Sequence, residues 1–494
     1  MTFSSLPFLF YFLPAVLILY YLFFFSRTLK NLILLVSSLV FYAWGEPKYI
    51  LLLIVSIAVN YCLGLLVNQV KSRKHAARFW MICALIFNVG TLFVFKYLSF
   101  VTKNISYATG GNTKILEIVM PIGVSFFTFQ AISYILDVYR NDAPVQKNFL
   151  NFALYLSFFP KLTQGPIMKY QTFEPQILER KETLRKFSSG ICFLIVGLGK
   201  KVLLANNMAI VADRVFSLNK MGSIPVSLAW LGAIAYTFQI YFDFSGYSDM
   251  AIGLGLMFGF KLDQNFDYPY ISKSIREFWR RWHISLGRWF RDYLYIPLGG
   301  SRVVNKDLII RNLAIVWILT GVWHGANWTF LIWGIINFVC IALERMFHFE
   351  KSKVPGFVRH IYAMFVVIIG WVIFRSDSLQ LAGSYIGCMF NFVKDGFYSD
   401  YTYMFLKEFW IYFLAAILFS IPFASYLNQF MAKGILLRKS IKPQFPYEEH
   451  SVYGEAPLVK VVTLVYPAAM ILLFLICTTY LVKGSYNPFI YFQF

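Results

Sequence analysis

The chain has 494 residues, of which 59% are hydrophobic and only 14% are charged, and its formal net charge is +21. Soluble domains average roughly 45–50% apolar and about 25% charged residues, so this composition excludes a soluble globular protein. A nucleic-acid-binding module is also excluded, because the basic residues are interleaved with apolar segments rather than gathered in one soluble region. The composition predicts an all-α polytopic membrane protein.

Thirteen apolar runs are candidate helices. They lie near 6–25, 32–44, 49–67, 79–98, 118–138, 188–204, 226–242, 247–260, 308–323, 328–343, 359–374, 409–424 and 459–482. A spanning helix needs about 20 residues, so the shorter runs are expected to be tilted, extended into their flanks or re-entrant. Leu154–Gly165 is a further re-entrant candidate. We expect on the order of 11–13 true spans, with a few shorter helices that enter without crossing.

The first apolar run, Leu6 to Phe25, has no basic residues before it and no small-residue cleavage site, which indicates a retained helix. Basic loops follow at 26–31 and 68–78. Because basic loops stay in the cytoplasm, both are predicted inside and the N-terminus outside, in the inner (cytoplasmic) cell membrane. The six cysteines include no CxxC pair, and no metal site is predicted.

His324 stands in unusual surroundings for a membrane segment. It lies in the sequence TGVWHGANW between two apolar runs, and the glycines around it predict a broken helix. An ionisable ring at membrane depth is costly and is usually functional. The alternative is a histidine at a helix end whose ring is satisfied by a backbone carbonyl.

His283 lies in a segment rich in arginine and tryptophan, between Ile275 and Arg291. The helical period places it on one basic face, opposite Phe and Trp side chains, which predicts an amphipathic interfacial helix or pair of helices. The basic residues of this segment that we assign to donor binding are Arg276, Arg280, Arg288 and Arg291. Such a face attracts lipid head groups or a phosphorylated acyl donor. The alternative is a snorkelling helix with an incidental histidine.

Acidic and hydroxyl side chains occur amid apolar residues between Tyr241 and Tyr270. Asp243, Ser245 and Asp249 are candidates to orient a histidine or bind a cation, or equally to cap a helix. The glycines that follow do not match the dinucleotide-binding fingerprint, and they are predicted to pack helices.

These segments also carry a resemblance to a known family. The matching motifs are Asp243–Asp249, Asn265-Phe266 with Pro269-Tyr270, Glu277–Tyr295 continuing to Gly300, Trp323–Trp328, and Phe41–Gly45 near the N-terminus. The sequence resembles the membrane-bound O-acyltransferase family, specifically its alginate O-acetylation branch. The resemblance covers most of the chain and is least clear over Ala382–Pro457.

The resemblance implies a single domain over 1–494, in which a ring of membrane helices with shorter helices inside surrounds a central funnel. We divide it into N-terminal spans (1–140), a catalytic core (141–345), and C-terminal spans with an aromatic tail (346–494). The resemblance implies that His324 is the catalytic histidine and that His283 is the second histidine of the family. Imidazole, with an ordinary pKa of about 6.5, serves acyl transfer as base or nucleophile. The supporting residues are Asp249, Asp243, Ser245, Asn327 and Trp323, of which Asn327 is a candidate to stabilise an oxyanion.

The implied reaction passes acetyl groups from cytoplasmic acetyl-CoA, with no bound cofactor, for O-acetylation of an extracytoplasmic polysaccharide such as alginate or another cell-envelope glycan. The chain contains no soluble domain for the final step, so the implied partner is a separate extracytoplasmic hydrolase-like acetyltransferase. The aromatic tail, Tyr486–Phe494, either docks that partner or lies in the membrane interface, and we favour the interface. The remaining alternatives are D-alanyl transfer to teichoic acid from a carrier protein and a proton-coupled transporter or flippase. Tyr295–Gly300 and the chain length favour the acetyl branch.

Overall fold

The computed structural model describes residues 1–494 except 112, 304–305, 394–395, 424–456, 485 and 489–494. Within these residues the structure contains helices and no strands. Nine of the described helices are long and apolar enough to cross a membrane, and two shorter apolar helices cover Phe8–Leu22 and Leu379–Phe390. The predicted class, an all-α polytopic membrane protein, is confirmed.

The N-terminal part consists of a series of apolar helices followed by short buried ones. The elements are the π-helical segment η1 (Phe8–Phe12), α1 (Leu13–Leu22), α2 (Arg27–Gly45), α3 (Ile50–Gln69), α4 (Lys74–Leu92), π-helical η2 (Phe93–Tyr97), α5 (Leu98–Ala108), α6 (Val124–Arg140), α7 (Phe149–Ser157), α8 (Phe159–Leu162) and α9 (Tyr170–Glu179). The expected re-entrant segment falls on α7 and α8, which are too short to span and are almost entirely buried in protein.

The middle of the chain forms two long continuous helical segments. The first runs through α10 (Leu184–Gly199), π-helical η3 (Lys200–Ala205) and α11 (Asn206–Met221), and the second is α12 (Val226–Met257). The apolar runs 226–242 and 247–260, expected as separate helices, are therefore one helix of 32 residues. The polar stretch between them does not break the helix because the Asp243 carboxylate is neutralised by Lys201, at 2.5 Å.

The C-terminal part begins with short helices and continues with further spans. The elements are η4 (Pro269–Ile271), α13 (Ile275–Arg281), α14 (Ile284–Phe290), π-helical η5 (Arg291–Tyr295), α15 (Lys306–His324), α16 (Trp328–Met346), η6 (Phe349–Lys351), α17 (Gly356–Arg375), α18 (Leu379–Phe390), α19 (Asp400–Phe419) and α21 (Pro457–Val482).

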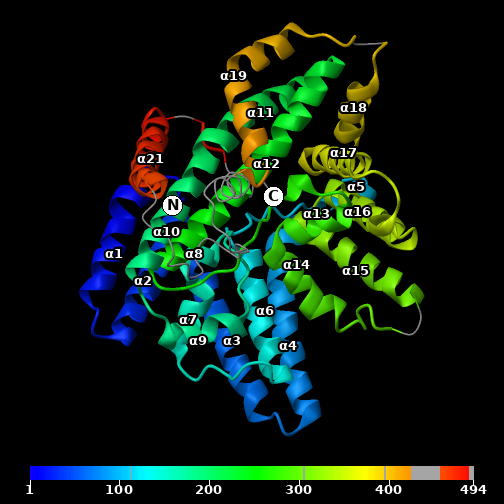
Figure 1. The fold of residues 1–494 in the computed structure, drawn as a ribbon. Coiled ribbons are helices and arrows are strands. Elements are labelled where there is room, and N and C mark those ends of the chain that lie inside the picture. Colours follow the sequence, from blue (N-terminus) through cyan, green and yellow to red (C-terminus); the bar gives the residue numbers. More distant parts are fainter. Residues whose placement is uncertain (112, 304–305, 394–395, 424–456, 485, 489–494) are drawn as a thin grey trace.

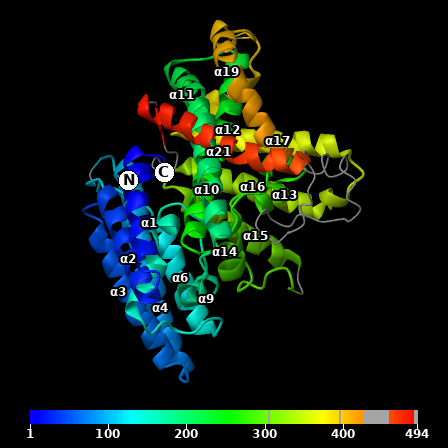
Figure 2. The same cartoon turned by 60° about the vertical axis from the view of Figure 1, so that its left-hand side comes forward.

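Helix α12 lies at the centre of this arrangement. Figures 1 and 2 show α1–α4 on one side of the molecule and α13–α17 on the other, with α10 and α12 between them. Nearly every residue of α12 is buried, as expected for a helix that is apolar on all sides. Its contact with α10 depends on glycine, because a Cβ added to Gly253 would lie 2.5 Å from the Gly190 carbonyl oxygen. Of the three glycines predicted to pack helices, Gly253 does so, whereas Gly259 lies beyond the end of α12 in a left-handed turn with a φ of +83°.

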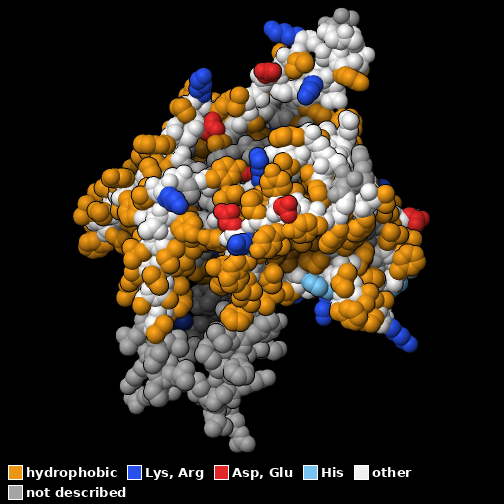
Figure 3. All heavy atoms as spheres, turned by 90° about the horizontal axis from the view of Figure 1, so that it is seen from above, with side chains coloured by type: hydrophobic (Ala, Val, Ile, Leu, Met, Phe, Trp, Pro, Cys, Tyr) orange, Lys and Arg blue, Asp and Glu red, His pale blue; other side chains and the backbone are white. Residues whose placement is uncertain are grey.

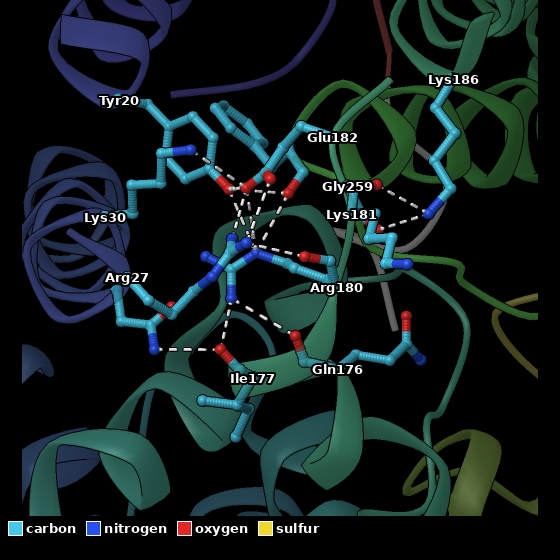
Figure 4. A network of polar contacts seen from close by, with 12 residues as sticks. Tyr20, Arg27, Lys30, Gln176, Ile177, Arg180, Lys181, Glu182, Lys186 and Gly259 are labelled. Atoms are coloured by element: carbon cyan, nitrogen blue, oxygen red, sulfur yellow. Dashed lines mark hydrogen bonds and ion pairs between the residues drawn. The ribbon is translucent and has the colours of Figure 1, made fainter. Parts of the chain in front are cut away.

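A buried polar network joins the first two helices to the end of α12 (Figure 4). The Arg27 guanidinium donates hydrogen bonds to the Glu182 carboxylate and, at 2.7 Å, to the Arg180 carbonyl oxygen. Tyr20 donates to Glu182 at 2.5 Å, and Arg180 Nε donates to the Phe258 carbonyl oxygen at 3.2 Å. Burial alone would raise the pKa of Glu182, but the hydrogen bonds from Arg27 and Tyr20 lower it to about 2. The network keeps the N-terminal helices against the central helix.

The outer surface is largely apolar. Figure 3 shows hydrophobic side chains over much of one face, with few charged groups among them. Large exposed side chains include Phe365 on α17 and Trp410 and Phe419 on α19. An apolar surface of this extent fits contact with lipid.

The described part of the predicted aromatic tail lies against its own chain. The Tyr486 hydroxyl donates a hydrogen bond to Asp213, and Asn206 Nδ2 donates to Asn487 Oδ1 at 3.1 Å. Residues 489–494 of the tail lie outside the described residues.

Candidate active site

His324 is the last residue of α15, and its ring is buried. A short turn, Gly325 to Asn327, leads directly into α16. The predicted broken helix is therefore a turn between two separate helices, each of which is long and apolar enough to span. The aromatic rings of Trp323, Trp333 and Phe374 surround the His324 ring, with centroid distances of 4.8, 5.0 and 5.2 Å. The imidazole is thus enclosed in an apolar, aromatic environment.

His283 occupies the sharp junction between α13 and α14. Its φ of +46° lies in the left-handed region, which is uncommon for a residue other than glycine and concentrates at functional sites. Its side chain is 2% exposed. The predicted amphipathic segment is therefore a pair of helices, and its basic face is interrupted at the histidine.

Asn265 fixes the orientation and tautomer of the His283 ring. Asn265 Oδ1 accepts hydrogen bonds from the backbone N–H of Ser285 at 3.2 Å and from its hydroxyl at 2.9 Å. The same oxygen lies 3.0 Å from His283 Nδ1. Because the Ser285 N–H must donate, this Asn265 atom is an acceptor, and His283 Nδ1 must carry the hydrogen. His283 Nε2 therefore presents a lone pair, and among the described residues it has no hydrogen-bond partner.

The His283 imidazole is neutral over the physiological range. Burial lowers its pKa to about 3, because the surrounding protein does not solvate the imidazolium ion. A neutral ring with a free Nε2 accepts a proton or a hydrogen bond from a substrate.

The two histidines line one cavity of about 190 Å³. The cavity wall is mostly apolar and includes the indole rings of Trp279, Trp282 and Trp317. The exposed Arg291 and the neighbouring Tyr295 also line it. The cavity therefore connects a basic group at the surface with the two buried imidazoles.

The four arginines assigned to donor binding are not gathered at this cavity. Arg276 and Arg280 both pair with Glu350, at 3.3 and 2.7 Å. Arg288 pairs with Asp263 at 3.2 Å. None of these three lines the cavity.

Arg291 is the one predicted donor-binding arginine that lines the cavity. Its guanidinium lies 2.7 Å from the Asp292 carboxylate, which also binds Lys169. Burial on its own would raise the pKa of Asp292, but the hydrogen bonds from Arg291 and Lys169 lower it. Arg291 is thus held at the cavity by an ionised carboxylate.

The acidic residues of α12 lie away from the cavity. Asp249 pairs with Lys200 at 2.6 Å, and Asp243 pairs with Lys201. Both acids, and Ser245 with them, lie inside the helix rather than at its N-terminus, so they do not cap it. Their ion pairs join α12 to η3.

Asn327 caps α16 through its side-chain oxygen, and its amide nitrogen binds a backbone carbonyl oxygen. Its Oδ1 accepts a hydrogen bond from the Thr329 N–H at 3.1 Å, and its Nδ2 donates to the Asp377 carbonyl oxygen at 2.8 Å. Trp323 lies next to His324 and stacks on Phe129, with ring centroids 5.3 Å apart.

Residues 143–384 match the family model of the membrane-bound O-acyltransferases. Over its full length the chain is 39% identical to the "probable alginate O-acetylase" of Azotobacter vinelandii, which it also covers completely. The chain belongs to the membrane-bound O-acyltransferase family.

Relatives of this acyltransferase differ in the polymer that their names specify. A peptidoglycan O-acetyltransferase of Helicobacter pylori is 37% identical over 77% of this chain and 78% of its own length. A teichoic acid D-alanyltransferase of Streptococcus thermophilus is 30% identical over 47% of this chain and 59% of its own length. The protein is an enzyme, a multi-pass membrane O-acyltransferase.

The sequence alone does not predict the contacts of two residues near the histidines. Asn265 was recognised only as part of a motif, and its link to His283 depends on the junction between α13 and α14. Lys96 is not among the predicted site residues, although its amine lies over the Trp323 ring, 5.5 Å from the centroid. Its position near the end of an apolar run was the available signal.

Proposed function

We propose that this acyltransferase takes acetyl groups from acetyl-CoA on the cytoplasmic side of the inner membrane and supplies them for O-acetylation of an extracytoplasmic polysaccharide. The N-terminus lies outside in this proposal. A separate hydrolase-like acetyltransferase completes transfer to the polymer, which is alginate or another cell-envelope glycan. Support comes from relatives whose names specify O-acetylation and from the geometry of the cavity.

The observation that carries the proposal is the single cavity lined by His283, His324 and Arg291. Acetyl-CoA has phosphate groups at one end, a thioester at the other and a largely uncharged arm between them. Arg291 suits the phosphates because guanidinium forms paired hydrogen bonds with them. The tryptophan-lined wall suits the arm, and the thioester then lies near the imidazoles.

The two histidines have different roles in this reaction. His324 takes the proton from the attacking hydroxyl, which is the general-base step of acyl transfer. His283 accepts a hydrogen bond from the bound reactants through Nε2 and must remain neutral. The apolar rings around His324 disfavour bound water, which helps to protect the thioester from hydrolysis.

A histidine replacement tests the proposal in cells. We expect His324→Ala to abolish ester-bound acetate on the envelope polysaccharides, released by mild alkali and quantified, while the variant accumulates normally in the membrane. His75→Ala is the matched control because His75 is exposed and does not line the cavity. Wild-type acetylation in the His324→Ala strain would show that the proposal is wrong.

The donor is tested separately with purified protein reconstituted into lipid vesicles. Transfer of a labelled acetyl group from acetyl-CoA supports the proposal. Incorporation of D-alanine from a charged carrier protein, with no transfer from acetyl-CoA, would instead establish the D-alanyl alternative.

A further inference from the structure

Lys96 is a charged residue within an apolar helix. It is the only charged residue between Arg78 and Lys103, in a continuous helix over Lys74–Ala108. The helix is locally π-helical at this point, over Phe93–Tyr97. Ionisable residues inside membrane helices and π-helical insertions both concentrate at functional sites.

The contacts of Lys96 and its neighbour Tyr97 place this part of the helix against the end of α15. Its amine lies over Trp323, and the hydroxyl of the next residue, Tyr97, donates a hydrogen bond to the Val322 carbonyl oxygen at 2.9 Å. Figure 1 shows α5, which continues this helix, beside α16, and Trp328 Nε1 donates to Asn104 at 3.3 Å. Among the described residues no carboxylate pairs with Lys96. A purely snorkelling lysine would direct its amine to the interface instead.

Trp323 presents a second unpaired donor at the same place. Its ring centroid lies 4.8 Å from that of His324 and 6.3 Å from that of His283. Its indole Nε1 is buried and has no acceptor within the described part of the chain. A buried N–H without an acceptor costs about 1–3 kcal/mol, so a ligand that supplies an acceptor at this position gains that free energy on binding.

We propose that the Trp323 indole N–H and the Lys96 ammonium form the electropositive group that stabilises the acyl oxygen during transfer at His324. The inference rests on the proposed function. Lys96 also acts through the indole, because a cation over the ring draws electron density from it and strengthens the N–H as a donor.

The step balances without a further reactant. The hydroxyl oxygen of the acceptor attacks the thioester carbon, a C–O bond forms, and its proton moves to His324. The carbonyl oxygen becomes negative, and it accepts the Trp323 N–H next to the Lys96 charge. The C–S bond then breaks, the carbonyl is restored, and the proton passes from His324 to the CoA thiolate. Donors placed at a developing oxyanion lower the barrier of such a step, and losing one typically costs about 10²–10³-fold in kcat.

Two variants separate the two groups. Trp323→Phe keeps an aromatic ring for stacking and for Lys96 but removes the N–H, and Lys96→Met keeps the length of the side chain but removes the charge. We expect each to lower kcat for acetyl transfer from acetyl-CoA in membrane vesicles at least 10-fold, with KM for acetyl-CoA within twofold of wild type. Lys96→Arg should retain more activity than Lys96→Met. Lys103→Met is the matched control, because Lys103 is exposed on the same continuous helix, and it should equal wild type.

The outcome is read against His324→Ala and against the thermal unfolding of each variant. Wild-type kcat in Trp323→Phe and Lys96→Met, with His324→Ala inactive, overturns this inference alone. A rise in KM with unchanged kcat overturns it too, since it would assign the groups to donor binding. Normal transfer by His324→Ala overturns the proposed function instead.

Discussion

Replacing Asn265 by aspartate places a carboxylate against His283 Nδ1, at a position where the neutral amide oxygen lies 3.0 Å away. The size and the acceptor atoms are conserved, so the hydrogen bonds from Ser285 can persist. An adjacent carboxylate favours the imidazolium ion and raises a histidine pKa by about 1–3 units. From the wild-type value of about 3, the pKa of His283 should rise to roughly 4–6.

The sign of the effect on rate follows from the need for a free Nε2. Below its pKa the His283 ring is protonated and has no lone pair, so the rate falls tenfold per pH unit. Wild-type kcat/KM, as far as it depends on His283, should be flat above about pH 4. In Asn265→Asp a decline should appear as the pH falls through roughly 4–6.

The assay is the pH dependence of kcat/KM for acetyl-CoA in membrane vesicles. Asn148→Asp is the control, because Asn148 is an exposed N-cap at which aspartate caps equally well. Profiles of Asn265→Asp and wild type that superimpose over the whole range would refute the reasoning. In that case either residue 265 does not set the pKa of His283, or the reaction does not need the lone pair on His283 Nε2.

Two further replacements test the cavity and the packing behind it. Arg291→Ala should raise KM for acetyl-CoA about 10-fold or more, because it loses a charged hydrogen bond of about 1.5–3 kcal/mol. Arg288 lies outside the cavity, so Arg288→Ala should leave KM unchanged. Equal KM values for both variants would count against donor binding at Arg291. Gly334→Ala puts a Cβ 2.6 Å from a backbone carbonyl oxygen of α15 and should destabilise the protein by about 1–3 kcal/mol in a detergent unfolding experiment. Gly383→Ala, in open space within a helix, should be neutral or stabilising by up to about 1 kcal/mol, so a similar loss in both would refute the packing argument.

Apolar patterning predicted the membrane class and most helices, because lipid leaves few other ways to satisfy the backbone. It did not predict where long helices continue. The polar stretch after Phe242 reads as a boundary, yet α12 passes through it because Lys201, from a helix about 40 residues earlier, neutralises Asp243. Pairing across helices of this kind depends on tertiary structure.

The histidines were identifiable from sequence because ionisable rings in apolar surroundings are rare. The basic face around His283 was less informative, since a uniform helical period assumes a continuous helix. The positive φ at His283 turns the chain there, and Glu350, about 70 residues later, binds Arg276 and Arg280. Which arginine reaches the cavity was therefore decided by a backbone junction and a distant acid.

The polar network at Glu182 has a consequence for biogenesis. Arg27 is synthesised 155 residues before its acidic partner, so the first two helices leave the ribosome with a guanidinium whose carboxylate has not yet been made. Those helices can therefore form the bond between Arg27 and Glu182 only after α9 and the loop after it have been made and inserted. A nascent chain arrested before residue 182 should expose this hairpin to membrane proteases, and a chain arrested beyond α12 should protect it.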